Sequence, residues 1–260
     1  MLTGKQREIL ERDRLFLSVA WDLLMQEGYQ GLTVERIAKQ TGFSRGTIYL
    51  RFGSKDGLVV SLGMEARLIL HSVLERAMKL SGRPRERMVA LGEASGYYAR
   101  HYPQHLRVVK LIEAETLLSR VSAEQRDEMV KYDLRIFQLL QETVLEAIRV
   151  GDLPPENDAS VAGVCYAFWA MMDGAFGSLY GGAPLEEVGI PDPFAAVISA
   201  GHRMMDGHGW RPLFREWDYA STSQRVRKLL DEAGEPGTPA FEGVLALQPF
   251  ELGTAMANRT

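Results

Sequence analysis

Apolar residues recur at helical spacing along most of the 260-residue chain, and no segment alternates apolar and polar positions as a half-buried strand would. The pattern predicts helices at residues 7–28, 54–80, 85–101, 103–119, 122–150, 157–181 and 192–206, with two shorter ones between 33 and 52. Glycine or proline marks most of the breaks between them. We therefore expect an all-α protein, in which the helix at 54–80, about 40 Å long at ~1.5 Å per residue, is a central element.

Residues 33–42 are predicted to form the first of the two short helices. Val34, Ile37 and Ala38 give it a single apolar stripe. Thr33 occupies the N-cap position, where a hydroxyl accepts a hydrogen bond from a first-turn N–H. Gly42 can adopt the left-handed conformation that ends many helices. The segment is thus a two-turn helix closed by a glycine turn.

A second short helix follows directly, with Ser44 as its cap. Ile48 and Phe52 are expected to face inward. The remaining side chains then point outward: Arg45, Thr47, Tyr49, Leu50 and Arg51. Two short helices joined by a tight turn, the second of them exposed, are typical of a helix-turn-helix that places its second helix in the major groove of DNA.

This region resembles the DNA-binding domain of the TetR family of bacterial transcriptional regulators. The resemblance covers residues 10–65 and rests on Gly28, Tyr29, Leu32, Thr33, Ile37, Ala38, Gly42, Phe43, Ser44, Gly46, Thr47, Ile48, Tyr49, Phe52 and Lys55. It implies a three-helix DNA-binding domain at residues 1–57, joined by a long fourth helix to a helical effector-binding and dimerisation domain at residues 58–206. It also implies a homodimer that binds a palindromic operator in double-stranded DNA. We expect a repressor that a small effector releases from the operator.

The candidate DNA-binding residues lie in and around the two short helices. Arg45 and Arg51 can donate hydrogen bonds to guanine or phosphate. The resemblance implies that Tyr49 and Lys55 contact the DNA backbone and that Arg45 and Leu50 meet base edges. An ordinary surface leucine is the alternative for Leu50. The full predicted set is Thr33, Ser44, Arg45, Gly46, Thr47, Tyr49, Leu50, Arg51 and Lys55.

The distribution of charge favours a DNA partner, although the net charge of the chain is −4. Residues 33–55 carry five basic side chains and a single acidic one, Glu35. Residues 1–57 hold nine basic and seven acidic residues, whereas the remaining residues hold twenty-one and twenty-seven. A basic tip on an acidic body would approach a phosphate backbone in one orientation.

The predicted helix at 157–181 carries a stripe of small residues at alternating spacings of four and three. The stripe consists of Gly163, Ala167, Ala170, Gly174 and Gly177. A glycine inside a helix costs about 1 kcal/mol relative to alanine, and close approach of another helix would explain its presence. The resemblance implies that the last two core helices form a four-helix dimer interface. We expect the stripe to lie there; burial inside one subunit is the alternative.

An effector pocket is predicted among the fifth to eighth helices, whose Leu, Val, Met and aromatic residues suit an apolar or amphipathic molecule. The candidate lining residues are Tyr97, Tyr98, Leu117, Phe137, Trp169 and Met172. Plain core packing is the alternative for each of them. Asp173 interrupts the apolar pattern and could anchor an effector or accept a hydrogen bond between subunits.

The sequence contains no recognisable catalytic set, so no enzyme activity and no cofactor are expected. His101 and His105 could suggest a metal site, but Pro103 between them disrupts the one-turn spacing that would align them, and no metal is predicted. The single cysteine, Cys165, suits a reducing compartment. The first residues lack the apolar core of a signal peptide, and no apolar run approaches the roughly 20 residues that span a bilayer. We expect a cytoplasmic protein without a membrane partner.

Residues 207–260 differ from the rest, because Gly, Pro and polar residues are frequent and apolar positions are scattered. One short helix is predicted at 222–233. We expect a C-terminal extension that is partly ordered and has no core of its own. The extension leaves an alternative function open, in which the chain binds DNA without a small-molecule effector and acts through protein partners bound by its body or tail.

Overall fold

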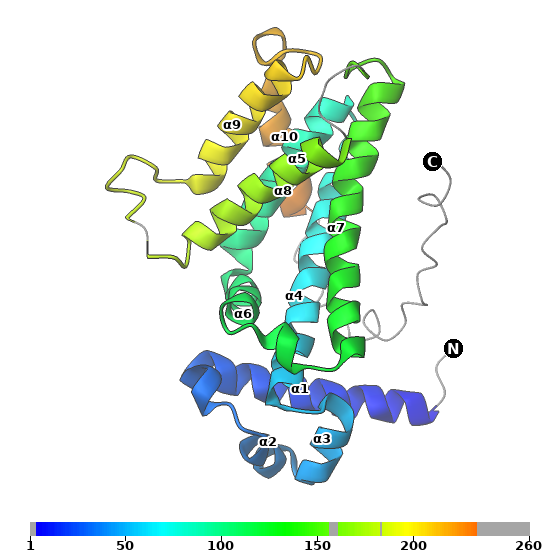
Figure 1. The fold of residues 1–260 in the computed structure, drawn as a ribbon, viewed down its shortest axis with the longest axis vertical. Helices are drawn as coiled ribbons and strands as arrows, with labels where there is room; N and C mark the ends of the chain where they lie inside the picture. The colour runs from blue at the N-terminus through cyan, green and yellow to red at the C-terminus, as the bar shows by residue number, and fades with distance from the viewer. Residues whose placement is uncertain (1–3, 156–160, 183, 233–260) are drawn as a thin grey trace.

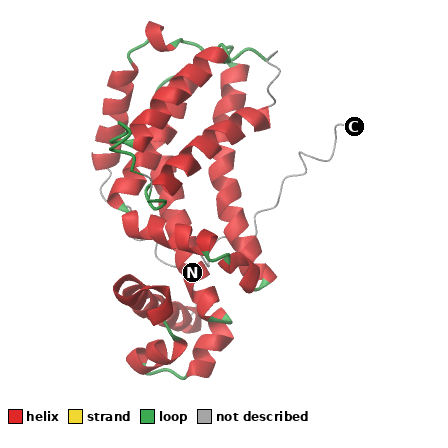
Figure 2. Cartoon of the chain, turned by 60° about the vertical axis from the view of Figure 1, so that its left-hand side comes forward, coloured by secondary structure: helices red, strands yellow, loops and turns green. Residues whose placement is uncertain are grey.

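The computed structural model describes residues 4–155, 161–182 and 184–232, and these residues form helices and loops without a strand (Figures 1 and 2). The predicted all-α class is confirmed. The described elements are α1 (Gly4–Gly31), α2 (Val34–Thr41), α3 (Arg45–Phe52), α4 (Lys55–Ala77), α5 (Pro84–His101), α6 (Pro103–Ala114), the 3-10 turn η1 (Leu117–Arg120), α7 (Ala123–Arg149), α8 (Val161–Ser178), α9 (Pro193–Gly207), the 3-10 turn η2 (Phe214–Glu216) and α10 (Tyr219–Glu232).

Local capping shapes the N-terminal domain, which consists of α1, α2 and α3 at one end of the molecule (Figure 1). The Thr33 hydroxyl accepts a hydrogen bond from the N–H of Arg36 at 3.3 Å, and the Ser44 hydroxyl accepts one from the N–H of Thr47 at 3.1 Å. Gly42 ends α2 in the left-handed conformation, with φ of 77°. Both predicted caps and the predicted glycine turn are therefore confirmed.

A small aromatic core joins α1 to the helix pair. Phe16 of α1 is fully buried and packs edge to face on Phe43 and Phe52, with ring centroids 5.2 and 6.2 Å apart. Gly28 has φ of 70°, which breaks the regular helix where the sequence predicted that it would end. The break in α1 at Gly28 thus occurs where the local glycine signal predicts it, and the aromatic contacts then hold α1 against α2 and α3.

α4 connects the N-terminal domain to the rest of the molecule. The Ser54 hydroxyl caps it by accepting a hydrogen bond from the N–H of Gly57 at 3.0 Å. Its first half packs into the core of the N-terminal domain and its second half into a separate distal core. α4 is long and apolar enough to cross a membrane by length and composition alone, but 67% of that apolar stretch is buried inside the fold. Burial of this kind is usual for a core helix.

α5, α7 and α10 pack against α4, and α8 and α9 pack on α5 and on each other to complete the distal domain (Figure 1). Here the structure departs from the prediction of one helix over 103–119. α6 ends at Ala114, and Thr116 adopts a left-handed conformation with φ of 51° before η1 begins. This break directs Leu117 into the core of the N-terminal domain, where it is fully buried.

The short helix predicted at 222–233 is present as α10, and residues 208–232, the described part of the predicted extension, pack onto the distal core. Trp210 is fully buried, and α10 packs along α5 through Val226 and Leu230. Tyr219, Val226 and Leu230 share one face of α10, so the helical period was present but spread over a polar segment. The rest of the predicted extension, 233–260, lies outside the described residues.

A fully buried arginine fastens this C-terminal segment to α5. The Arg85 guanidinium donates to the carbonyl oxygens of Trp210 and Pro212 at 2.6 and 2.8 Å and lies 2.7 Å from the Asp206 carboxylate. Removing a buried charge from such partners is costly. The segment is therefore held by specific polar contacts as well as by apolar packing.

Two further ion pairs join α5 to α10. Glu86 is buried and pairs with Arg225, while Glu93 accepts two hydrogen bonds from Arg227 at 3.0 and 3.1 Å. Charged residues on α5 thus face α10 rather than water, which explains why α5 is polar in sequence yet almost entirely buried.

Candidate nucleic-acid interface and internal cavity

α2 and α3 lie at the end of the molecule farthest from α9 and α10 (Figure 1). Leu50 of α3 has 91% of its surface exposed and Tyr49 has 46%, whereas Ile48 and Phe52 are buried. A leucine exposed to this extent gains little from the fold itself. Its exposure on the outer face of α3 leaves it available for a thymine methyl group or another apolar partner.

Arg45 is exposed at the start of α3. One of its guanidinium nitrogens lies 3.2 Å from the carboxylate of Glu35 on α2, which is also exposed. An ion pair between two solvated side chains is weak. The Arg45 guanidinium is therefore free to exchange this partner for a phosphate oxygen or a guanine edge.

Arg51 is held in a different way. Its Nε lies 2.5 Å from Oδ2 of Asp13, an α1 residue that is completely buried. The pair ties the last turn of α3 to α1 and orients the helix. A DNA contact by Arg51 stays a prediction, and the structure gives this side chain a positioning role within the domain.

Lys55 and Asp56 bind the end of α1 to the start of α4. Nζ of Lys55 donates to the carbonyl oxygen of Tyr29 at 3.0 Å and lies 3.8 Å from the centroid of the Tyr29 ring. The Tyr29 hydroxyl donates to the Asp56 carboxylate, and burial together with this hydrogen bond raises the pKa of Tyr29 to about 12. The joint lies at a helix N-terminus, a position that suits an anion such as phosphate.

A second joint runs from α7 to the N-terminal domain. Nε2 of Gln125, in the first turn of α7, lies 3.5 Å from the carbonyl oxygen of Phe52 and 3.3 Å from that of Gly57, and donates to both. Met129 and Tyr132 of α7 lie in the same core as Phe52. Both α4 and α7 therefore connect the distal domain to the helix-turn-helix.

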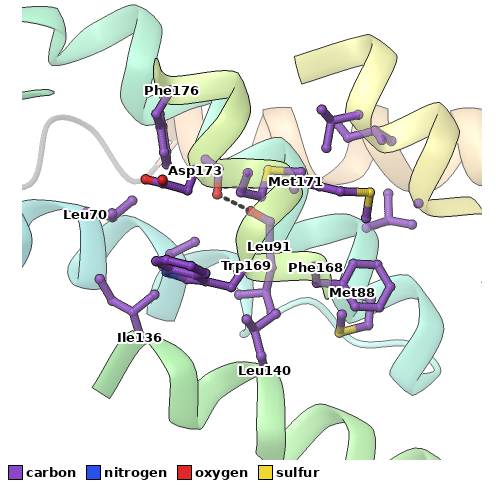
Figure 3. A pocket seen from close by; sticks show the side chains of 18 of the residues that line it. Leu70, Met88, Leu91, Ile136, Leu140, Phe168, Trp169, Met171, Asp173 and Phe176 are labelled. Atoms are coloured by element: carbon purple, nitrogen blue, oxygen red, sulfur yellow. Dashed lines mark hydrogen bonds between the residues drawn. The ribbon is translucent and has the colours of Figure 1, made fainter. Parts of the chain in front are cut away.

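An internal cavity of about 80 Å³ lies among α4, α5, α7, α8 and α9 (Figure 3). A single water needs roughly 10–15 Å³, so the cavity has room for a small ligand or several waters. Most of its wall is apolar, with Met88 and Phe168 at one end and Leu70 near the other (Figure 3). The polar side chains in the wall are Arg67, Ser95, Asp133 and Asp173.

Charged side chains from four helices meet at the polar end of the cavity. Arg67 of α4 lies 2.9 Å from Asp133 of α7, and Lys110 of α6 lies 2.8 Å from both Asp173 of α8 and Glu113. Burial raises the pKa of Asp133, and the nearby Arg67 charge opposes this shift. Although burial acts in the other direction, hydrogen bonds to Asp173 and Glu113 raise the pKa of Lys110. Lys110 therefore favours its charged form, whereas burial disfavours the charged form of Asp133.

Three of the predicted effector residues line the cavity: Trp169, Met172 and Asp173. Sequence reasoning missed Arg67 and Asp133, which come from the fourth and seventh helices. Arg67 and Asp133 could have been found in the sequence, because each is a charged residue within an otherwise apolar helix face. The same feature led to the prediction of Asp173.

The other four predicted effector residues lie elsewhere. Tyr97 is buried and stacks on His101, and the Tyr98 hydroxyl donates to a backbone carbonyl of α4 at 3.2 Å. Leu117 belongs to the core of the N-terminal domain, and Phe137 packs against the distal core. For these four, the alternative of core packing describes their position in the structure.

The small-residue stripe on α8 faces outward. Gly174 and Gly177 have open space where a side chain would stand, so neither packs against another helix of the described chain. Tyr166 and Trp169 beside them are 61% and 42% exposed. α9 also turns small residues outward, namely Ala195, Ala196, Ser199 and Ala200. Two adjacent helices thus expose small residues, with the rings of Tyr166 and Trp169 beside those of α8.

The histidines and the cysteine take part in packing. The His105 ring lies 4.5 Å from that of Trp21, and burial lowers the pKa of His105 to about 4. No group of three or more metal-ligating side chains occurs among the described residues. Cys165 is buried, which raises the pKa of its thiol to about 11 and keeps it protonated and unreactive.

Comparison with known sequences places the N-terminal domain in one family. The sequence model described as "Bacterial regulatory proteins, tetR family" matches residues 16–62. The repressor AcnR of Corynebacterium glutamicum is 38% identical over 63 residues, which are 24% of this chain and 30% of AcnR. The uncharacterized regulator YuxN of Bacillus subtilis is 36% identical over 52 residues, 20% of this chain and 18% of YuxN. The match thus spans less than a third of either relative.

Comparison with solved structures extends the similarity to the distal domain. The TetR family regulator PfmR from Thermus thermophilus superposes with a TM-score of 0.54 at 18% identity, over 74% of this chain and 97% of PfmR. AibR, solved in complex with isovaleryl coenzyme A and operator DNA, superposes with a TM-score of 0.52 at 17% identity, over 76% and 99%. At these identities the likeness concerns the fold. The N-terminal domain matches the sequence model of the TetR family, and the described residues share the fold of PfmR and AibR.

Proposed function

We propose that this chain is a cytoplasmic repressor that binds a palindromic operator as a homodimer and is released by a small apolar or amphipathic effector. The observation that carries the proposal is α3, whose outer face exposes Arg45, Tyr49 and Leu50 while caps and Asp13 fix its orientation. The helix is short and rigidly seated, as a recognition helix in a major groove must be.

The outer face of α8 and α9 supports the homodimer. Small residues allow close approach of helix backbones, and the exposed rings of Tyr166 and Trp169 supply apolar area beside them. A two-fold axis through this face would place two copies of α3 on the same side of the dimer. Half-sites about one helical turn apart, or somewhat more, would then contact both copies.

The cavity supports the effector. It lies between the two helices that contact the N-terminal domain, α4 and α7, so that a ligand there would act on both joints. AcnR is described as a repressor, and AibR was solved with both a coenzyme A ester and operator DNA. These descriptions agree with the proposed pairing of a DNA site and a ligand site.

The test is selection of a binding sequence from random double-stranded DNA, followed by measurement of affinity by fluorescence anisotropy. We expect a palindromic site whose affinity falls steeply with salt. Arg45→Ala and Tyr49→Ala should each weaken binding about tenfold, or ~1.4 kcal/mol, without loss of helicity.

The matched control is Arg149→Ala. Arg149 is exposed at the end of α7 that lies away from the N-terminal domain, so this variant should bind DNA as the unaltered chain does. Failure to select any sequence, or equal affinity in all three variants, would contradict the proposal.

A further inference from the structure

The polar end of the cavity exposes its acidic groups and covers its basic ones. The side chains of Asp133 and Asp173 are 44% and 42% exposed, whereas those of Arg67 and Lys110 are 17% and 15% exposed. Lys110 donates to Asp173 and Glu113, and Arg67 donates to Glu113 at 3.4 Å. Nε of Arg67 lies 2.9 Å from Asp133 as an ion pair but makes no hydrogen bond within the described residues. A molecule entering the cavity therefore meets carboxylate oxygens before it meets a cation.

The cluster also carries one negative charge more than its cations neutralise when all its members are ionised. Asp133, Asp173 and Glu113 face only Arg67 and Lys110. The contacts of Asp133 and Asp173 use Oδ1 of each, and within the described part of the chain Oδ2 of neither residue has a hydrogen-bond partner. Two acceptor oxygens and one uncompensated charge remain for a ligand.

Apolar surface extends from these carboxylates in one direction. Ile136 and Leu140 of α7 line the cavity three and seven residues beyond Asp133. Leu70 and Leu74 of α4 line it at the same offsets beyond Arg67. Seven residues of helix span about 10 Å at ~1.5 Å per residue, so the apolar wall has roughly that length.

Aromatic rings flank the acidic end. Trp169 and Phe176 lie on α8 on either side of Asp173 and line the same cavity (Figure 3). The face of an aromatic ring attracts a cation, and the attraction grows when water is excluded. A carboxylate group of a ligand at this place would instead be repelled by Asp133 and Asp173.

We propose that the effector is a hydrophobic monocation, an alkyl or aryl ammonium whose nitrogen lies at Asp133 and Asp173 and whose apolar body lies along Ile136 and Leu140. The inference rests on the proposed function, because it names the ligand class of the cavity. Burial already raises the pKa of Asp133, and the positive charge of such a ligand would stabilise the ionised form.

Three compounds of equal chain length and different head charge test the inference: octyltrimethylammonium, octanol and octanoate. Binding to the purified full-length chain is measured near neutral pH by calorimetry and by intrinsic tryptophan fluorescence. We expect octyltrimethylammonium to bind at least about tenfold more tightly than octanol, and octanoate more weakly than octanol. Octanoate binding as tightly as the ammonium, or no binding by any of the three, would overturn the inference.

Neutral variants identify the groups responsible. Asp133→Asn and Asp173→Asn should bring octyltrimethylammonium to the affinity of octanol, while octanol binding is retained and reports an intact cavity. Glu142→Gln, an exposed carboxylate on the same helix as Asp133, is the control and should change nothing. Retention of the full ammonium preference in both aspartate variants would also overturn the inference.

Because operator sequences are selected without ligand, the proposal of DNA binding and the proposal of a cationic ligand can be refuted independently. A chain that selects an operator but prefers octanoate refutes only the ligand class. A chain that selects no DNA sequence refutes the proposed function, whatever it binds.

Discussion

Arg45 and Arg51 lie on the same short helix and were predicted to serve the same purpose, but their surroundings differ. Arg45 has a solvated partner that it can exchange, whereas Arg51 holds a carboxylate that has no contact with water. Sequence spacing assigns both to the outer face of α3, and only the position of Asp13 on another helix separates their roles. A side chain can therefore belong to the outer face of α3 by its spacing and still act mainly on the fold.

Replacing Arg51 tests this distinction. Arg51→Ala leaves the buried Asp13 carboxylate unpaired, and we expect the free energy of unfolding to fall by about 2–3 kcal/mol, somewhat below the value for a fully buried pair. Chemical denaturation followed by circular dichroism measures the change. Asp13→Leu/Arg51→Leu, which removes both charges, should recover most of the stability. Arg45→Ala should leave stability unaltered, and an equal loss in that variant would contradict the assignment.

His202 links the C-terminal segment to acid sensitivity. Its ring is buried between Phe214 and Tyr219, with centroids 4.6 and 4.7 Å away. Burial and the neighbouring Arg85 charge lower the pKa of His202 to about 4, against the partial opposition of Asp206. The folded chain thus keeps this imidazole neutral where an exposed histidine would be protonated.

The sign of the pH effect follows from this difference. Between pH 6.5 and about 4 the unfolded chain binds a proton at His202 that the folded chain does not, so the free energy of unfolding should fall as pH falls. Below about 4 both states are protonated and this contribution levels off. Denaturation at several pH values should show a shallower decline for His202→Asn than for the unaltered chain. His105, whose pKa is lowered in the same way, accounts for part of the remaining decline.

Helices and their caps were predictable from the sequence because the signals are local. Thr33, Ser44 and Gly42 act within one turn of their own positions, and the helical period of the apolar residues is visible without tertiary structure. The end of α6 and the packing of α10 were not predictable in this way. The left-handed Thr116 is stabilised by the burial of Leu117 in another domain, and Arg85 is satisfied by carbonyl groups over a hundred residues away. The sequence could not separate the cavity-lining residues from core residues, since core and lining positions share one helical pattern; Trp169, Met172 and Asp173 line the cavity, and the other four predicted residues do not.

One substitution in the small-residue stripe on α8 tests whether the stripe forms the dimer interface. Gly174→Leu adds a side chain into space that is open within one chain, so each subunit should fold normally. Between two closely packed copies the same side chain would overpack the interface, which typically costs about 1–3 kcal/mol. Sedimentation should show a shift toward monomer, and operator affinity should fall with it.

Gln224→Leu adds the same apolar bulk on the exposed face of α10 and is the matched control. An intact dimer in the Gly174→Leu variant would place the stripe outside the interface.

At the scale of the whole molecule, two helices run from the cavity wall to the N-terminal domain. α4 begins at the joint of Lys55 and Asp56 with Tyr29, and the first turn of α7 carries Gln125, which donates to the carbonyl oxygens of Phe52 and Gly57. A ligand changes DNA affinity only if it binds more tightly to one arrangement of these joints than to the other.

Breaking the joint between α7 and the N-terminal domain should therefore reduce the effect of the ligand on operator affinity, while the chain still binds both the ligand and the operator. In the unaltered chain, saturating octyltrimethylammonium should lower operator affinity at least about tenfold, or ~1.4 kcal/mol of coupling. Gln125→Ala should bind the ammonium and the free operator normally but show a smaller drop, measured by titrating DNA with and without ligand. Gln141→Ala, on the same helix away from the joint, should respond fully. Equal responses in the two variants would leave α4 as the sole route.

Because α4 is long, a very small movement at the cavity would produce a large displacement at the proposed DNA-binding end of the molecule. Leu70 in the cavity wall is fifteen residues from Lys55, a lever arm of about 22 Å at ~1.5 Å per residue. Pivoting α4 by about 5° around the cavity would swing its lower end by ~2 Å, and in a symmetric pair the two reading helices would separate by up to ~4 Å. That is more than a tenth of the roughly 34 Å between half-sites one turn apart, enough to pull one helix out of register. A lever of this kind would allow a compact ligand, no larger than a cavity of about 80 Å³ admits, to control a DNA contact made by the neighbouring domain.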